Sequence, residues 1–393
     1  MKKVLHFGAG NIGRGFFGQL YCQSGYHVIF VDIDESIIKM LNGRKEYPLW
    51  LTGKEIEKLT IKNVSGINFT DRQAILKASK DINLLSFSVG VNNVGNLIQV
   101  LKEIIENKAI SNPSSQLNII IGENIKDASK TLKQHIIKNL SPSAVEYFEK
   151  NVGLVETVLG RMIPIVPEQL KKQYPLIVLA EPYYTMPVAK NMFKGELPQV
   201  KGFLFVDDIE TYEAMKLYIH NFTHAAFAYA GHKKGYTFIW QTVADRKIKD
   251  LVHKAHIEVK QAINKKYNIT LKEIDDYYND LLARFSNKNL ADTVIRVARE
   301  PIRKIGPNDR IIGAAKLCQN QNILPEYISF FAALCIYYDE PSDPESRKLK
   351  NLLETRGLDY VLENISGLSR QDSLYGLIKE KCLNFWKIKE KML

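Results

Sequence analysis

The sequence predicts an α/β protein in which an N-terminal, doubly wound parallel sheet is followed by a mainly α-helical C-terminal domain. Three observations predict this class. A glycine-rich turn joins a strand-like run to a helix-like run at the N-terminus, apolar strand-like runs then alternate with helical segments up to about residue 180, and helical periodicity dominates from about Asp207 onward. We expect the domain boundary at the end of the last strand-like run, which gives domains of residues 1–190 and 191–393.

Length and composition agree with two or three soluble domains. The chain has 393 residues, of which 45% are hydrophobic and 25% are charged. The net charge of +11 is spread along helical stretches without a block of basic residues, so we expect no nucleic-acid partner. Part of this positive charge could instead serve an anionic substrate and an anionic cofactor.

The cysteines and the N-terminus indicate a reduced, cytoplasmic protein. The four cysteines are far apart and form no Cys-x-x-Cys pair, so we expect free thiols. The N-terminus lacks the pattern of a signal peptide, and no apolar run approaches the ~18–20 residues that a membrane span requires. We therefore expect no membrane partner.

The N-terminal turn has the pattern of a dinucleotide-binding site. The run Val4–Phe7 reads as a strand, the segment Gly8–Gly13 follows it as G-x-G-x-x-G, and a helical pattern comes next. Asp32 ends the second strand, 19 residues after Gly13, where a carboxylate accepts hydrogen bonds from ribose hydroxyls and favours NAD over NADP. This combination predicts an NAD-binding Rossmann-type domain.

The sheet continues with two further buried strands. Residues 82–87 end at Ser88 and Val89 before a helix over 94–105, and residues 117–121 are followed by Asn124 and a helix over 125–137. Asn124 could face a ligand or cap that helix. A last strand-like run covers 176–180. We expect the cofactor to contact the glycine turn and the carboxyl ends of the strands, at Gly8, Gly10, Asn11, Ile12, Gly13, Asp32, Ser88 and Val89.

The second half of the chain reads as a series of helices. We expect them near residues 208–231, 244–266, 271–284, 308–319, 325–337, 343–355 and 371–388. In the first of these, about 100° of rotation per residue places Glu213, Lys216, His220, Asn221 and His224 on roughly 140° of one face. This face is either part of a catalytic site or the satisfied polar side of a core helix.

A basic segment precedes the later helices. Residues 296–304 form the densest basic cluster, and Pro301 makes the segment bend. Guanidinium groups presented from a bend suit a phosphate or a carboxylate, and we expect Arg299, Arg303 and Lys304 to bind substrate. Surface ion pairs with Glu300 and Asp309 are the alternative. His253 and His256 lack a nearby third ligand, so we expect no metal site there.

Several motifs resemble those of one family. The opening His6–Phe16 is similar to that of the mannitol-1-phosphate 5-dehydrogenases, a branch of the long-chain polyol-specific dehydrogenases. That family has a catalytic lysine, an asparagine five residues later and a histidine three residues beyond, a pattern that Lys216, Asn221 and His224 match. Segments 193–198, 299–304 and 306–310 also resemble the phosphate-specific branch, so the resemblance spans nearly the whole chain.

The resemblance implies a metal-free, reversible oxidation of D-mannitol 1-phosphate to D-fructose 6-phosphate with NAD. It implies that Lys216 is the general acid/base and that Asn221, together with Asn124, donates hydrogen bonds to the developing oxyanion. His224 would orient the substrate hydroxyl or Lys216, and Glu213 resembles an acid that relays protons to solvent in related enzymes.

One position departs from the family. Gly160 stands where the family commonly has an acid, which leaves room for a different substrate specificity. A dehydrogenase for another polyol, phosphorylated or not, and a non-catalytic NAD-binding protein therefore remain as alternatives. The expected partner is a small sugar phosphate, and the expected assembly is a monomer or a small homo-oligomer.

Overall fold

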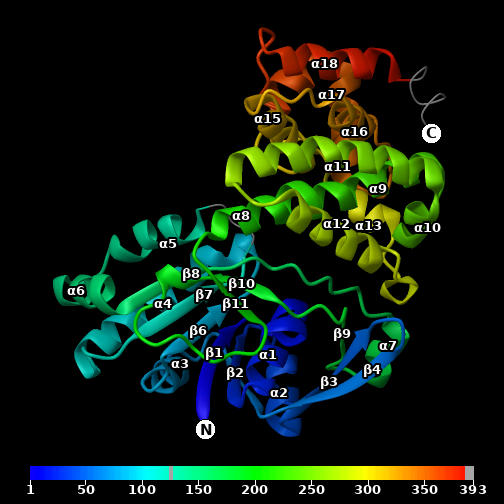
Figure 1. Cartoon of the computed structure of the whole chain (residues 1–393). Coiled ribbons are helices and arrows are strands. Elements are labelled where there is room, and N and C mark those ends of the chain that lie inside the picture. Colours follow the sequence, from blue (N-terminus) through cyan, green and yellow to red (C-terminus); the bar gives the residue numbers. More distant parts are fainter. Residues whose placement is uncertain (124–126, 386–393) are drawn as a thin grey trace. The chain divides into compact units, whose positions relative to one another are not determined.

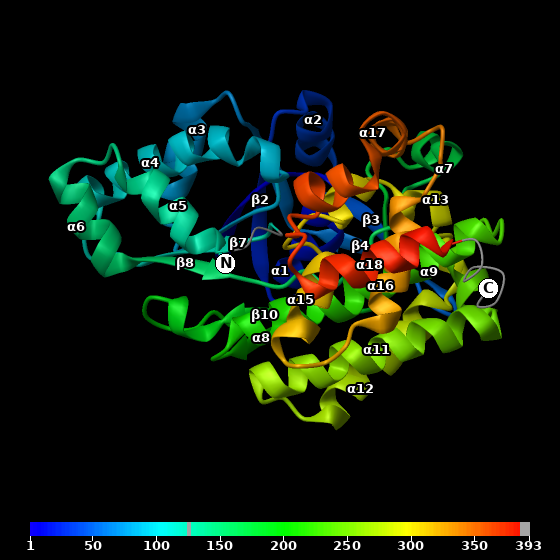
Figure 2. The same cartoon turned by 90° about the horizontal axis from the view of Figure 1, so that it is seen from above.

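The computed structural model describes residues 1–123 and 127–385 (Figure 1). The chain divides into two compact units, Met1–Ile209 and Glu210–Leu393. In both views the first unit runs from blue to green and the second from green to red (Figure 2). The compact units therefore divide after Ile209, and the domain boundary expected after residue 190 stays a prediction.

The first unit is built on a six-stranded sheet in the order β5-β2-β1-β6-β7-β8. All five strand pairs are parallel. Its strands are β1 Lys2–Phe7, β2 Tyr26–Asp32, β5 Val64–Asn68, β6 Leu84–Phe87, β7 Leu117–Ile121 and β8 Val152–Glu156. The order reverses between β1 and β6, which is the switch point of a doubly wound sheet and the place where such sheets bind ligands. The predicted α/β class is confirmed.

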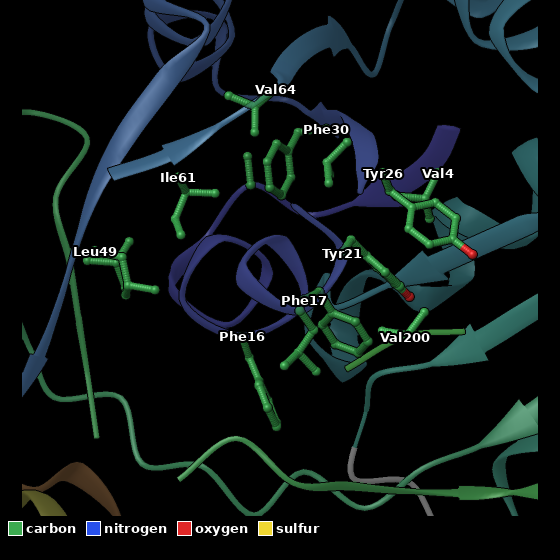
Figure 3. Packing of buried hydrophobic residues seen from close by; sticks show 14 of the residues in the cluster. Val4, Phe16, Phe17, Tyr21, Tyr26, Phe30, Leu49, Ile61, Val64 and Val200 are labelled. Carbon is green, nitrogen blue, oxygen red and sulfur yellow. The ribbon is translucent and has the colours of Figure 1, made fainter. Parts of the chain in front are cut away.

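Side chains on opposite faces of this sheet enter two separate cores. Val4 and Val28 point into a core with the N-terminal helix, whereas Leu5 and Phe7 point into a core with the other helices. Figure 3 shows Phe16, Phe17 and Tyr21 of the N-terminal helix packed in the first core. The helices of the unit are η1 Gly13–Phe17, α1 Gly18–Gln23, α2 Glu35–Arg44, α3 Arg72–Ser79, η2 Val91–Asn93, α4 Val94–Ser111, α5 Ala128–Ile137, α6 Pro142–Asn151, α7 Glu168–Gln173 and η3 Lys190–Met192.

Two smaller sheets complete the first unit. In one, β3 Glu46–Thr52 pairs with β4 Ile56–Lys62 and with β9 Val178–Ala180, and in the other β10 Met186–Ala189 pairs with β11 Phe203–Val206. The strand expected over 176–180 therefore exists as β9 but joins the β3 sheet rather than the main one.

The second unit is helical. Its elements are α8 Ile209–Ala214, η4 Met215–Asn221, α9 Phe222–Lys233, α10 Ile239–Ala244, α11 Arg246–Tyr267, α12 Leu271–Phe285, η5 Lys288–Leu290, α13 Val294–Ala298, α14 Pro301–Lys304, α15 Ile312–Asn320, α16 Glu326–Ile336, α17 Pro344–Tyr360, η6 Val361–Ile365 and α18 Ser373–Leu383. All seven predicted helices have a counterpart in the described residues, and the end of the last one, over 386–388, lies outside them. In the described part of the chain, no helix has the combined length and apolarity of a membrane span.

The first of these helices is not a uniform α-helix. Between α8 and α9 the backbone forms a π-helix, η4, in which the Phe222 N–H donates to the carbonyl of Leu217, five residues back. A π-turn holds more residues than an α-turn, so the angles expected from 100° per residue do not apply to Met215–Asn221.

Candidate active site

The glycine turn after β1 has the geometry that close approach of a ligand requires. Gly8 has a φ of +103°, and a Cβ there would lie 2.5 Å from the Ser88 carbonyl oxygen. A Cβ on Gly13 would lie 1.9 Å from the Gly8 carbonyl oxygen. At Gly10 a Cβ would meet nothing within 4 Å, so the backbone faces open space there. Asn11 and Ile12 are exposed beside it.

Asp32 is tied to this turn. One of its carboxylate oxygens accepts a hydrogen bond from the Ala9 N–H at 2.5 Å, and the other accepts from the Asp34 N–H at 2.9 Å. The side chain is only partly buried, and each oxygen retains a second lone pair. The carboxylate therefore braces the glycine turn and can still accept hydrogen bonds from ribose hydroxyls.

A buried histidine supports the neighbouring strand end. His6 on β1 is fully buried, with Nδ1 2.6 Å from Ser86 Oγ and Nε2 3.0 Å from Ser88 Oγ. Burial lowers the pKa of His6 to about 3, so the ring stays neutral. This contact was not predicted, although a polar residue inside an apolar strand-like run was its signal in the sequence.

The strand end beyond Ser88 is also fixed. Val89 is half-buried, and the Gly90 N–H donates to Glu123 Oε1 at 2.6 Å. Burial raises the pKa of Glu123 despite the backbone donors that favour its charged form. The structure thus brings the expected cofactor residues together around one switch point. Asn124, expected next to this position, lies outside the described residues.

Lys216 has a histidine partner in the second unit. Its Nζ lies 3.0 Å from Nδ1 of His220, and both side chains belong to η4. In a π-helix residues five apart are aligned by the hydrogen-bond pattern, and Lys216 and Asn221 are five apart. Lys216 and Asn221 are half-buried, and so is Glu213 at the end of α8. π-turns inside helices occur frequently at functional sites.

His224 is held by a carboxylate that the sequence analysis did not single out. Its Nε2 lies 3.0 Å from Asp292 Oδ2, and its ring stacks on Phe285 with centroids 4.4 Å apart. Arg296 donates to both oxygens of Asp292, at 2.6 and 2.7 Å. Burial lowers the pKa of His224 more than Asp292 raises it, so the imidazole is neutral near pH 7. No sequence spacing pointed to Asp292.

The three basic residues expected to bind substrate have different surroundings. The Arg303 guanidinium donates to Glu300 Oε2 at 2.8 Å and to Asp309 Oδ2 at 3.1 Å. Lys304 is buried, donates to the Arg299 carbonyl, and has a pKa lowered to about 7 by that burial. The Arg299 side chain is 59% exposed. The predicted bend at Pro301 is present. Arg303 forms ion pairs with both Glu300 and Asp309, which was the alternative to substrate binding.

Gly160 is buried against an aromatic ring. A Cβ at this position would lie 3.2 Å from Tyr183, so a larger residue would require that ring to shift. The adjacent Arg161 donates to the carbonyls of Glu181 and Gly15, which links this segment to the N-terminal helix.

His256, in the histidine pair of α11, packs against an aromatic ring and contacts a carboxylate. The His256 ring stacks on Tyr278 with centroids 3.7 Å apart, and its Nε2 lies 3.3 Å from Asp275. Within residues 1–123 and 127–385, no group of three His, Cys, Asp or Glu side chains is arranged to hold a metal ion.

Comparison with known proteins assigns both units to one family. Residues 2–202 match the mannitol dehydrogenase Rossmann domain, and residues 208–385 match the mannitol dehydrogenase C-terminal domain. The chain is similar to a mannitol-1-phosphate 5-dehydrogenase of Thermoanaerobacter pseudethanolicus, with 35% identity over 97% of each chain. A protein of the same name from Bacillus subtilis is 34% identical over 96% of this chain and 99% of its own length.

Solved structures share the fold. A substrate-free D-sorbitol dehydrogenase superposes with a TM-score of 0.82 at 14% identity, covering 99% of this chain and 93% of that one. A Pseudomonas fluorescens mannitol 2-dehydrogenase in a ternary complex with NAD and D-mannitol gives a TM-score of 0.73 at 16% identity, covering 99% and 92%. At such identities the likeness concerns the fold. Together with the matches along the sequence, it confirms the predicted resemblance: the chain is an oxidoreductase of the mannitol dehydrogenase family.

Proposed function

We propose that this protein catalyses the reversible, NAD-dependent oxidation of D-mannitol 1-phosphate to D-fructose 6-phosphate. The observation that carries the proposal is the near-complete match to relatives named mannitol-1-phosphate 5-dehydrogenase, in a chain that also has Lys216, Asn221 and His224 on one helix. Members of the same fold act on other polyols, so the fold alone would not select this substrate.

The first unit would hold NAD at the glycine turn. Open space at Gly10 suits a pyrophosphate against the backbone, and the partly exposed Asp32 suits the ribose hydroxyls. Ser88 and Val89 would line the same switch point at the end of β6. When bound, NAD supplies the acceptor for the hydride that leaves the substrate carbon.

Lys216 would act as the general acid/base. As hydride leaves the carbon, the hydroxyl must lose its proton, and an amine can take that proton. A lysine ordinarily titrates near ~10.4, so it needs cationic or apolar neighbours to act near neutral pH. In the reduction the same ammonium group returns the proton to the carbonyl oxygen.

Neutral donors would stabilise the charge that develops on the oxygen. The Asn221 carboxamide would donate to it, and Asn124, which lies outside the described residues, would be a second donor. His224, held through Nε2 by Asp292, would orient the hydroxyl, and Glu213 would pass protons to solvent. With an ammonium group and carboxamides in the electrophilic role, we propose a reaction that uses no metal.

Arg299, Arg303 and Lys304 are the proposed phosphate-binding residues. A specific observation favours a second candidate, a dehydrogenase for an unphosphorylated or different polyol. Glu300 and Asp309 already engage the Arg303 guanidinium, which reduces the positive charge it offers to a phosphate. Gly160 supports the same alternative.

The two candidates are separated by the oxidation of NADH in the presence of fructose 6-phosphate or fructose. The proposal expects a kcat/KM for fructose 6-phosphate at least 100-fold above that for fructose. A preference for fructose would favour the second candidate, and no turnover of either ketose despite NADH binding would contradict both.

Replacement of Lys216 tests the role of the base. Lys216→Ala should lower kcat by about 10²–10⁴-fold, the usual contribution of general acid–base catalysis, and should leave NADH affinity within twofold. Steady-state rates and NADH fluorescence titration measure the two effects. Lys249→Ala, which removes an exposed lysine on α11, is the matched control. A Lys216→Ala enzyme with most of its activity would rule out this assignment.

A further inference from the structure

We propose that His220 is a positioning residue that accepts a hydrogen bond from Lys216 Nζ and thereby holds the amine in the orientation a proton acceptor requires. The inference rests on the proposed function, because it assigns His220 a role through Lys216. It starts from the 3.0 Å contact between Lys216 Nζ and His220 Nδ1. The family pattern of lysine, asparagine and histidine does not include this residue.

The chemistry of the two groups fixes the direction of the hydrogen bond. A lysine ammonium group has only donors, so Nδ1 must carry a lone pair and the ring proton must sit on Nε2. The ring is buried, with 1% of its surface exposed. Burial and the positive charges of Lys216 and Arg284 hold the pKa of His220 well below its ordinary value, so the ring stays neutral.

The groups around this pair come from several elements. Lys216 and His224 share the helix with His220, Arg284 comes from α12, and Arg310 precedes α15. Asp292, after η5, and Arg296 of α13 act on His224. The described groups that lower the pKa of His220 are the cationic Lys216, Arg284 and Arg310, together with His224, which is neutral near pH 7. None of these groups favours an imidazolium ion at position 220.

The ring itself is held in place. Phe285 lies edge-on to His220 with centroids 5.5 Å apart, and the His224 ring lies 6.2 Å away. His220, Lys216 and Asn221 all belong to the π-turn η4, so one local backbone feature sets their relative positions. A fixed acceptor limits the rotation of a long side chain.

The contact with His220 sets the orientation in which the Lys216 amine can act as a base. One N–H of Lys216 is directed to His220, so the lone pair of the deprotonated amine points away from that ring, in a direction from which it can take a proton. The same acceptor stabilises the ammonium form more than the amine. Removal of the acceptor should therefore misorient the amine and also lower the pKa of Lys216.

The test is the pH profile of kcat/KM for mannitol 1-phosphate oxidation in wild type, His220→Leu and His220→Asn. Leucine removes the acceptor, whereas the Asn Oδ1 replaces Nδ1 at nearly the same position. For His220→Leu we expect the acid limb to move to lower pH by about 1 unit, because the partly solvated ammonium group of Lys216 loses a hydrogen-bond acceptor. The plateau should fall at least 10-fold, with KM for NAD unchanged. His220→Asn should keep the acid limb within about 0.3 pH unit of wild type, because its Oδ1 still accepts the hydrogen bond from Lys216.

A purely structural role predicts a different result. It would lower the plateau or the melting temperature of His220→Leu without moving the acid limb, and that outcome overturns the proposal. An asparagine variant that shifts as far as the leucine variant overturns it as well. His253→Leu, which removes an exposed histidine on α11, is the matched control and should leave the profile unchanged.

A measurement on the wild-type enzyme covers the case in which the leucine variant does not fold. The ¹⁵N shifts of the His220 ring, identified by their absence in His220→Asn, should show a proton on Nε2 and none on Nδ1 at pH 7. A proton on Nδ1 would overturn the proposal. If wild type does not oxidise mannitol 1-phosphate, the proposed function fails. The ¹⁵N spectrum would still show which ring nitrogen of His220 carries the proton.

Discussion

At the scale of single residues, two histidines of one helix differ in what surrounds them. His220 contacts a lysine amine and has the cationic Arg284 and Arg310 near it, whereas His224 contacts the carboxylate of Asp292. Both are kept neutral near pH 7, because burial lowers both pKa values. A neutral ring can accept a hydrogen bond at one nitrogen and donate at the other, which suits orientation rather than charge compensation.

The carboxylate of Asp292 provides a test through stability. Burial alone would raise its pKa, but hydrogen bonds from His224 and Arg296 and the positive charge of Arg296 lower it to about 2. Because the folded pKa lies below the unfolded one, the carboxylate stabilises the fold above pH 4 and loses this effect as the pH falls toward 2. Asp292→Asn should therefore lower the free energy of unfolding by about 2 kcal/mol at pH 7.

Thermal unfolding of both proteins between pH 7 and pH 3 measures this effect. The difference between wild type and Asp292→Asn should narrow toward the acid end. Asp276→Asn breaks an exposed ion pair with Lys272 on α12 and should leave the melting temperature unchanged. A difference that stays constant with pH would show that Asp292 acts by packing alone.

Asp32 provides a second test at this scale, on the cofactor. Asp32→Ala removes an acceptor for the ribose hydroxyls and a brace of the glycine turn, so NAD affinity should fall about 10–100-fold, the value of a hydrogen bond to a charged group. NADP, whose 2′-phosphate the carboxylate repels, should lose less. Fluorescence titrations with both reduced cofactors decide this. The control is Asp71→Ala, which removes a helix cap elsewhere in the unit. Equal losses of affinity for both cofactors would contradict the proposal that Asp32 binds the ribose hydroxyls.

At the scale of elements, the sequence predicted what depends on local pattern. The glycine turn, its two flanking strands and Asp32 were placed correctly because tight turns and strand ends constrain residue type directly. The π-turn of η4 was not predictable, because its residues also suit an α-helix and only the packing of the folded unit selects the wider turn. The β3–β4 hairpin was missed because Glu57, Lys58 and Lys62 mask the alternation of Ile56–Lys62.

The glycine turn also provides a test at this scale. Gly13→Ala would place a methyl group 1.9 Å from the Gly8 carbonyl oxygen, so the backbone of the turn would have to move. NADH affinity should fall at least 10-fold in fluorescence titration. The control is Gly95→Ala in α4, where a Cβ meets nothing within 4 Å and alanine is the better helix former by about 1 kcal/mol. Unchanged NADH affinity in Gly13→Ala would mean that the turn tolerates a shift.

At the scale of the whole molecule, the boundary between the two units is set by contacts between residues that are far apart in the sequence. The sequence pattern assigned residues 191–209 to the C-terminal domain, yet they contribute β11, which pairs with β10 in parallel. Phe203 packs on Tyr21 with ring centroids 6.2 Å apart, and the Lys201 N–H donates to Ser24 Oγ at 2.8 Å. These contacts join the segment to the N-terminal helix, which local pattern could not reveal.

The two possible boundaries make different predictions for isolated fragments. A fragment of residues 1–209 keeps β11 and the buried Val200, so it should unfold cooperatively and bind NADH with an affinity within about fivefold of the intact chain. A fragment of residues 1–190 leaves an edge of β10 unpaired and uncovers Tyr21, so it should unfold at least 10 °C lower or aggregate, as expected when several kcal/mol of core contacts are lost. Circular dichroism melts and NADH titration of both fragments decide between the boundaries. Equal stability and affinity would show that residues 191–209 belong to neither core, and that the first unit ends where the strand pattern of the sequence ends.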